Sequence, residues 1–373
     1  MTTTQYSLSK GTGNSKLSQL QQDIINNFQK GFPLCSRPYL AIAQKLSRDH
    51  SKLSEETIFT ALSDLDYLGI ISRIGPVFDH KKAGASTLAA LAVATKDLDK
   101  IASIINQFEQ VNHNYARGSH LNKTDYNLWF VVTASDPVAL NNTLTRIELL
   151  TGLKVLILPM EASYHLDLAF TINVTGNASL IVNEQKSIVA INEDVPTLTK
   201  IPPLTEIAKS QLRKLIEAGL PKLLHPYEQI AQALNITEQQ VLAQITTWQK
   251  TGLIRRFGLV VKHRKLGFNA NAMVVWNISS EKVDAIAAKL AKREEVSLCY
   301  RRPRRLPDWP YNLFCMIHGT DKDLVLQQIK EITAQLSLTD IEKDILFSFK
   351  AYKQKGASYL SKDLRVKNEA AHG

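Results

Sequence analysis

The first part of each half of the chain carries apolar residues at helical spacing. In the second half, an apolar stripe runs through residues 212–216, and the segments PYEQIAQAL and TEQQVLAQITTWQKTGLI continue the pattern. Asn235 and Thr237 are residue types that favour the ends and starts of helices, and Gly252 is typical of a helix stop. Three short helices followed by the β-rich stretch LIRRFGLVV therefore predict a winged helix-turn-helix.

The later part of each half has a different pattern. NANAMVVWNI predicts a strand, SEKVDAIAAKLAKREEV an amphipathic helix, YNLFCMIHG a strand, DKDLVLQQIKEITAQL a second helix and IEKDILFSF a last strand. The segment CYRRPRR enters one further strand after the first helix. The resulting order, β-α-β-β-α-β, predicts a ferredoxin-like sandwich.

The two halves repeat one another. PYLAIAQKL from Pro38 matches PYEQIAQAL from Pro226, and RIGPVFDHKKAG from Arg73 matches RFGLVVKHRKLG from Arg256. Self-similarity in the same order predicts an α+β tandem duplication, in which each unit is a winged helix-turn-helix followed by a ferredoxin-like domain. The predicted segments are a disordered arm at 1–16, a winged helix-turn-helix at 17–85, a ferredoxin-like domain at 86–170, a linker at 171–204, a second winged helix-turn-helix at 205–268, a second ferredoxin-like domain at 269–362 and a tail at 363–373.

Composition limits the possible partners. The 373 residues carry a formal net charge of +10 and a sequence pI of about 9.3, which favours an acidic partner such as nucleic acid, an anionic membrane surface or a polycarboxylate. No apolar run reaches the length of a membrane span. Three cysteines without a CxxC or CxxCH pair argue against covalent haem attachment and a cysteine zinc site, and they favour a reducing cytoplasm.

A DNA-binding regulator is the plain interpretation of this domain order, because the Lrp/AsnC transcription regulators have a similar plan. A recognition helix must approach phosphates and base edges. The segment SEETIFTALSDLDYLG from Ser54 carries four acidic residues and no basic one, so it would repel phosphate. The segment TEQQVLAQITTWQKTG from Thr237 offers glutamines, which can read adenine, and one lysine near its end. The regulator therefore stays an alternative rather than the main hypothesis.

A histidine recurs at the same place in both copies, among basic residues. His263 stands in VVKHRKLG and His80 in VFDHKKAG. Positive surroundings depress the pKa of an imidazole, whereas a bound carboxylate reverses this effect and makes imidazolium available as an acid. The pattern suggests a proton donor that acts only when an anionic substrate is present. A structural or merely exposed histidine is the competing interpretation.

The segment CYRRPRRLPDWPYNLFCMIHG concentrates four arginines beside prolines. Guanidinium groups bind carboxylates through paired hydrogen bonds and keep their charge. Alternation along a strand would divide these arginines between two faces, and Arg302 is favoured for the pocket because Arg117 matches it in the first copy. Trp309 could pack on a flat ring, although an aromatic side chain there is as often part of a core.

The two sites are expected to be unequal. In the first copy the matching segment is YARGSHLNKTDYNLW, in which only Arg117 remains of the arginine cluster. Either one site is catalytic and the other degenerate, or the two handle different parts of one ligand. No catalytic triad spacing, phosphate loop or HExxH motif appears, and acidic residues are scarce in these segments, so catalysis by a divalent metal is not expected.

GLIRRFGLVVKHRKLGFNANAMVVW followed by CYRRPRRLPDWPYNLFCMIHG resembles the siroheme decarboxylases, which share the Lrp/AsnC plan but act in tetrapyrrole biosynthesis. The resemblance covers about residues 17–170 and 205–362, and the first copy is similar to the smaller partner subunit of that family. It implies that siroheme loses the carboxyl groups of two acetate side chains, at ring carbons 12 and 18, giving 12,18-didecarboxysiroheme and carbon dioxide without a cofactor. The fused arrangement is similar to that on the route to haem d1, and the alternative haem pathway uses the same reaction.

The resemblance also implies residue roles. His263 and His80 are the expected proton donors. The expected substrate-binding residues are Arg73, Tyr115, Arg117, Arg256, Lys265, Tyr300, Arg301, Arg302, Arg304, Arg305 and Trp309. Arginine forks beside aromatic side chains match a flat ring that carries eight carboxylates.

Siroheme is thus the expected ligand of an internal pseudo-dimer, with DNA and membrane not expected as partners. Further siroheme decarboxylase subunits and a larger oligomer stay open. The alternatives are an Lrp/AsnC-type regulator that senses a tetrapyrrole and a tetrapyrrole carrier without catalysis.

Overall fold

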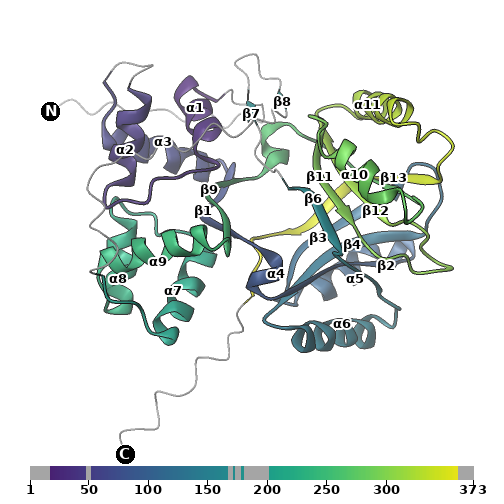
Figure 1. Cartoon of the computed structure of the whole chain (residues 1–373), viewed down its shortest axis with the longest axis horizontal. Coiled ribbons are helices and arrows are strands. Elements are labelled where there is room, and N and C mark those ends of the chain that lie inside the picture. The colour runs from purple at the N-terminus through teal and green to yellow at the C-terminus, as the bar shows by residue number, and fades with distance from the viewer. Residues whose placement is uncertain (1–16, 48–51, 167–170, 173–177, 180–200, 360–373) are drawn as a thin grey trace, which may run out of the picture.

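The computed structural model describes residues 17–47, 52–166, 171–172, 178–179 and 201–359. The predicted arm, the predicted tail and most of the predicted linker lie outside these residues. Within the described part, a winged helix-turn-helix followed by an αβ domain occurs twice, so the predicted fold class is confirmed. Figure 1 shows the helix-turn-helix units on one side of the molecule and the αβ domains on the other.

Capping residues and prolines begin the helices of each helix-turn-helix, and Thr237 acts as the cap that the sequence suggested. Ser54 caps α3 and Thr237 caps α9, each by accepting a hydrogen bond from the backbone N–H three residues later. Pro38 and Pro226 occupy the first positions of α2 and α8, where proline removes no helical hydrogen bond. The helices and wing strands are α1 (Gln19–Phe28), α2 (Pro38–Leu46), α3 (Glu55–Tyr67), β1 (Ile71–Phe78), α7 (Glu206–Ala218), α8 (Pro226–Leu234), α9 (Glu238–Lys250) and β9 (Ile254–Val261).

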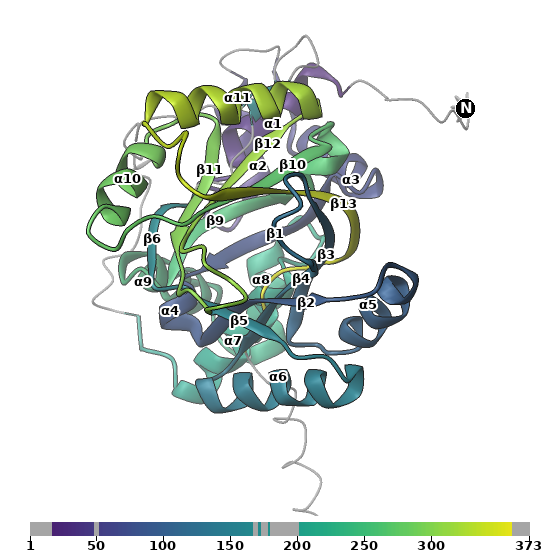
Figure 2. The same ribbon diagram turned by 90° about the vertical axis from the view of Figure 1, so that its right-hand side faces the viewer.

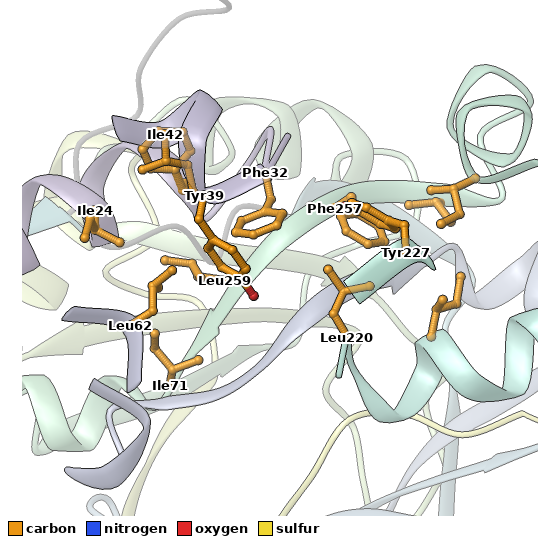
Figure 3. Close-up of a cluster of buried hydrophobic side chains, with 14 of the residues drawn as sticks. Ile24, Phe32, Tyr39, Ile42, Leu62, Ile71, Leu220, Tyr227, Phe257 and Leu259 are labelled. Carbon is orange, nitrogen blue, oxygen red and sulfur yellow. The ribbon is translucent and has the colours of Figure 1, made fainter. Parts of the chain in front are cut away.

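The two wings pair with each other. β1 and β9 form a two-stranded antiparallel sheet in which Gly75 lies opposite Gly258. The connection also crosses between units, because the N–H of Phe32 donates to the carbonyl of Phe257 at 3.1 Å. The buried side chains of both units form one core, and Figure 3 shows Tyr39 of the first unit and Tyr227 of the second within it. The helix-turn-helix pair is therefore a single packed body.

The αβ domains follow the predicted strand and helix order. The first contains β2 (Ala85–Ala92), η1 (Thr95–Asp97), α5 (Leu98–Asn106), β3 (Val111–Ser119), β4 (Tyr126–Ala134), α6 (Pro137–Thr151), β5 (Leu156–Pro159) and β6 (Ala162–Leu166). The second contains β10 (Ala270–Trp276), α10 (Val283–Leu290), β11 (Val296–Arg301), β12 (Leu313–Gly319), α11 (Lys322–Gln335) and β13 (Lys343–Gln354). Short helices, α4 (His80–Ala83) and η3 (His263–Leu266), join each wing to its αβ domain, and β7 (Thr171–Ile172) pairs with β8 (Ala178–Ser179).

Both αβ domains share one nine-stranded sheet, in the order β5-β2-β4-β3-β13-β10-β12-β11-β6. The last strand of each unit crosses to the other unit: β13 pairs with β3, and β6, which follows β5, pairs with β11. In Figure 2 the sheet curls, with α11 above it and α6 below it. Trp129 and Trp309 pack together on its inner face, with ring centroids 5.2 Å apart. The predicted internal pseudo-dimer is confirmed, and this shared sheet joins its two αβ domains.

We expect Gly258→Ala to destabilise the protein by roughly 1–3 kcal/mol, the range found for overpacked sites. An added Cβ at this position would lie 2.3 Å from the carbonyl oxygen of Gln29, and backbone cannot move aside as a flexible side chain can. Urea denaturation measures the change. Gly118→Ala is the matched control, because its Cβ would meet only Phe349 at 3.9 Å. Equal midpoints for the two variants would contradict the tight contact between β9 and α1.

Candidate active site

The two predicted histidines begin the short helices that follow the wings. His80 is the first residue of α4 and His263 the first residue of η3. Their backbone is placed, whereas their side chains lie outside the described part of the structure. Their role as proton donors therefore stays a prediction, and the residues around each turn define the candidate site.

Five residues beside one face of β3 form what we call the first cluster: Arg73 from β1, His113, Tyr115 and Arg117 from β3, and Arg264 from η3. His113, Tyr115 and Arg117 alternate along β3 and so lie on the same face. Arg117 is only 7% exposed, and its Nη1 donates to the carbonyl of Leu346 on β13 at 3.2 Å. Its guanidinium lies 5.6 Å from the centre of the Tyr115 ring. Burial lowers the pKa of Arg117 to about 10, which leaves it charged at neutral pH.

Arg264 joins the His263 turn to this face. Its Nη2 donates to the carbonyl of Ser348 at 2.9 Å and to the Ser348 hydroxyl at 2.7 Å. Ser348 lies opposite Arg117 in the pairing of β13 with β3. The positive charge of Arg264 adds to that of Arg117 and helps to lower the pKa of Arg117. The second unit's histidine turn is thus fixed beside the first unit's strand.

Arg73 reaches the same cluster from the wing. Its Nη2 donates to the carbonyl of Pro76 at 2.9 Å, and an added Cβ at Gly356 would meet its Nη1. Burial first, and then the charge of Arg256, lowers the pKa of Arg73 to about 10, against a smaller opposing effect of Glu217. Glu217 itself pairs with Arg213. Arg73 therefore brings a third guanidinium to the cluster without an ion pair of its own among the described residues.

His113 is the residue that the sequence analysis missed. Burial, and next the charge of Arg73, lowers the pKa of His113 to about 4, so the ring is neutral at physiological pH. The ring stacks on Tyr115 with centroids 6.1 Å apart and an angle of 19° between planes. The signal was available, because His113 precedes Tyr115 and Arg117 at strand spacing in VNHNYARGS.

The second cluster occupies the corresponding place in the second αβ domain: Asp79, Arg255, Tyr300 and Arg302. Arg302 is 8% exposed, and its Nη1 donates to the carbonyl of Leu158 at 2.6 Å, as Arg117 does to Leu346. Its guanidinium lies 5.4 Å from the Tyr300 ring and 5.7 Å from the Phe314 ring. Arg255 pairs with Asp79, the residue before His80, through Nε at 2.7 Å and Nη2 at 2.6 Å. Burial raises the pKa of Tyr300, and the charges of Arg302 and Arg255 oppose that rise.

The remaining predicted residues have other surroundings. Arg301 pairs with Glu161 and Asp284, Arg304 donates to the Asn277 side chain and the Ile278 carbonyl, and Arg305 donates to the Ile157 carbonyl. Arg256 donates to the Gln29 carbonyl, Lys265 is exposed, and Trp309 is fully buried within the aromatic core. The structure thus separates Arg302 from its neighbours in the arginine-rich segment. Contact of these six side chains with substrate stays a prediction.

Both clusters contain buried guanidinium Nε donors without an acceptor among the described residues. The Nε atoms of Arg73, Arg264 and Arg302 are buried and donate to no acceptor within the described part of the chain. Buried donors normally have partners, and a guanidinium is best matched by a carboxylate. The first cluster gathers three guanidinium groups for which no ion pair is found in the described residues. Such a place suits a ligand with several carboxylates.

Other features of the described residues do not suit this chemistry. An open hollow of about 470 Å³ between α1 and α3 is lined by Glu56 and Asp64, which would repel carboxylates. Among the described residues no group of three or more His, Cys, Asp or Glu side chains could hold a metal ion. Nor does any described helix have the length and apolar character needed to cross a membrane.

Family models match most of the chain. The AsnC-like ligand binding domain matches residues 82–165 and 265–353, and the siroheme decarboxylase NirDL-like HTH domain matches residues 21–71 and 210–255. A siroheme decarboxylase NirDL subunit of Paracoccus denitrificans is 34% identical over 345 residues, which span 92% of this chain and 98% of that protein. A siroheme decarboxylase NirD subunit of Pseudomonas aeruginosa is 42% identical over 159 residues, spanning 43% of this chain and 99% of that subunit.

Solved structures have the same fold. The crystal structure of the siroheme decarboxylase NirDL matches with a TM-score of 0.63 at 22% identity, over 92% of this chain and 94% of that one. A co-complex of siroheme decarboxylase NirDL with an iron-uroporphyrin III analogue matches with a TM-score of 0.62 at 23% identity, over the same shares of both chains.

We expect the stability of the protein to fall between pH 7 and pH 5 by up to about 2 kcal/mol more than that of a His113→Gln variant. The pKa of His113 is about 4 in the folded chain and about 6.5 when unfolded, so the unfolded chain binds the extra proton as the pH falls through this window. Urea denaturation at the two pH values measures the difference. His225→Gln, which changes an exposed histidine, is the control. Parallel losses in wild type and His113→Gln would contradict the low pKa.

Proposed function

Because the chain belongs to the siroheme decarboxylase family, we propose that it removes the carboxyl groups of two acetate side chains of siroheme, at ring carbons 12 and 18. The products are 12,18-didecarboxysiroheme and two molecules of carbon dioxide. The observation that carries the proposal is the first cluster, in which Arg117 and Arg264 lie beside Tyr115 and Arg73 lies beside His113. None of the three arginines forms an ion pair among the described residues.

Binding neutralises the charge of the cluster. Arg73 and Arg264 offer buried Nε donors that lack acceptors in the described part, and a carboxylate accepts from such a fork with two oxygens. Arg117 is held against Tyr115 and the Leu346 carbonyl, so its guanidinium does not need to reorganise when the substrate arrives. Tyr115 supplies a ring face against which a macrocycle can pack.

The chemical step is the loss of carbon dioxide followed by protonation. The bond between the methylene carbon and the carboxylate carbon breaks, and its electron pair is delocalised into the conjugated macrocycle. A proton from an acid then adds to the methylene carbon, which becomes a methyl group. The step consumes one proton and no oxidant, so no cofactor is required, and siroheme brings its own iron as part of the substrate.

The proton donor we propose is His263, with His80 at the equivalent turn. His263 directly precedes Arg264, whose guanidinium is fixed beside Arg117. Substrate carboxylates raise the pKa of a neighbouring imidazole towards the range in which it can donate a proton. His113 responds to the same change, because part of its low pKa comes from Arg73.

The geometry of the wings favours the enzyme over the DNA-binding alternative. In this chain β1 and β9 are paired with each other along their length, so neither wing is presented separately to a groove. The first turn of α3 carries Glu55 and Glu56, and Glu55 is buried against Arg37. Acidic groups at the start of a recognition helix repel phosphate.

We expect His263→Ala to retain siroheme binding and to lose at least about 99% of its turnover, the scale of a general acid's contribution. Purified protein is incubated anaerobically with siroheme, and the extracted tetrapyrrole is analysed by mass. Wild type should give a product that has lost two carboxyl groups as carbon dioxide. His225→Ala is the control, since this exposed histidine precedes α8, outside both clusters.

Turnover near the wild-type rate in His263→Ala would show that another group supplies the proton. Binding by wild type with unchanged mass would instead support a carrier or a sensor, and a DNA-binding assay would then separate these two.

A further inference from the structure

The two clusters differ first in the residue two positions before the tyrosine. In the first cluster it is His113, whose ring stacks on Tyr115 beside Arg73. In the second it is Leu298, which packs against the apolar core formed by Tyr300, Trp309 and neighbouring side chains. A titratable group that can respond to a bound carboxylate is thus replaced by an apolar side chain.

The second difference lies beside the histidine turns. Asp79 directly precedes His80. Its Oδ2 accepts a hydrogen bond from Arg255 Nε at 2.7 Å and lies 2.6 Å from Arg255 Nη2 in the same ion pair. Lys262 directly precedes His263, and Ser72 stands where Arg255 would on the other wing. The Ser72 hydroxyl donates to the Val260 carbonyl at 2.9 Å. The second cluster therefore contains the carboxylate of Asp79, whereas the corresponding residue beside the first cluster is the cation Lys262.

The third difference is how each arginine is covered. Arg302 is stacked by two rings, Tyr300 and Phe314, while Arg117 has Tyr115 alone among the described aromatic rings. A substrate carboxylate approaching the second cluster would have to compete with the largely buried carboxylate of Asp79 for Arg255. At the first cluster it meets Arg73, Arg117 and Arg264, which have no ion pair to break in the described part.

From these differences we infer that the chain has one siroheme site for its two units, at the first cluster, and that the Asp79–Arg255 ion pair closes the equivalent place. The inference rests on the proposed function, because it concerns the same substrate. The single site is composite: Tyr115 and Arg117 come from the first unit, and the His263 turn with Arg264 comes from the second. Both decarboxylations then take place at this site.

A stoichiometry measurement and a matched pair of variants test the inference. Siroheme is titrated anaerobically into the full chain, and the complex is weighed by native mass spectrometry. Arg117→Leu and Arg302→Leu have matched structural consequences, because each removes a buried guanidinium and leaves one strand carbonyl, of Leu346 or Leu158, without that donor. We expect one siroheme per chain, a loss of affinity of at least tenfold in Arg117→Leu, and a change below threefold in Arg302→Leu.

Two sirohemes per chain, or equal losses in the two variants, would overturn the single site. If Arg117→Leu does not fold, Arg73→Leu replaces it, because Arg73 reaches the same cluster from the wing and is less buried than Arg117. The stoichiometry and the affinities measure binding alone, so they test the single site independently of the decarboxylation. One siroheme bound with unchanged mass would keep the single site and reject the decarboxylase, while absence of siroheme binding to wild type would reject both.

Discussion

The exchange of last strands between the two αβ units is the constraint on which the rest of the molecule depends. β13 pairs on one side with β10 of its own unit and on the other with β3, and β6, which follows β5, pairs with β11. The carbonyl of Leu346 on β13 accepts from Arg117, and the carbonyl of Leu158 on β5 accepts from Arg302. Each buried arginine is thus positioned by backbone from the other unit, and a separated unit would lack that acceptor.

Burying a charged guanidinium group without a carboxylate partner is unfavourable, and this cost lowers its pKa. Burial lowers the pKa values of Arg73, Arg117 and Arg302 to about 10 and that of His113 to about 4. A ligand with several carboxylates removes this penalty, so part of its binding free energy comes from relieving repulsion already present. The same ligand shifts nearby histidines towards the protonated form, which links binding to proton supply.

Duplication within one chain allows the two halves to diverge while the fold keeps its symmetry. The two wing strands β1 and β9 pair with each other, and the sheets of the two αβ domains join, as they would in a dimer of identical units. The side chains at corresponding positions are free to differ, because each position occurs once in the chain's own sequence. His113 against Leu298, and Lys262 against Asp79, are such differences. A fused chain can therefore keep a binding place in one half and fill the other with an internal ion pair.

The sequence by itself determined the duplication, the order of helices and strands, and the residue types of the site. These features are local, because a helix cap such as Thr237, strand alternation and repeated segments such as RFGLVVKHRKLG depend on neighbouring positions. Alternation predicted that the arginines of CYRRPRR divide between two faces, and the structure gives Arg301 two acidic partners. Only the tertiary structure decided that Arg264 of one unit lies beside Arg117 of the other. It also decided that Arg304 and Arg305 donate to backbone carbonyls, and that Arg255 forms an ion pair with Asp79. These contacts join residues far apart in the chain, and they depend on strand exchange and wing pairing, which no local pattern encodes.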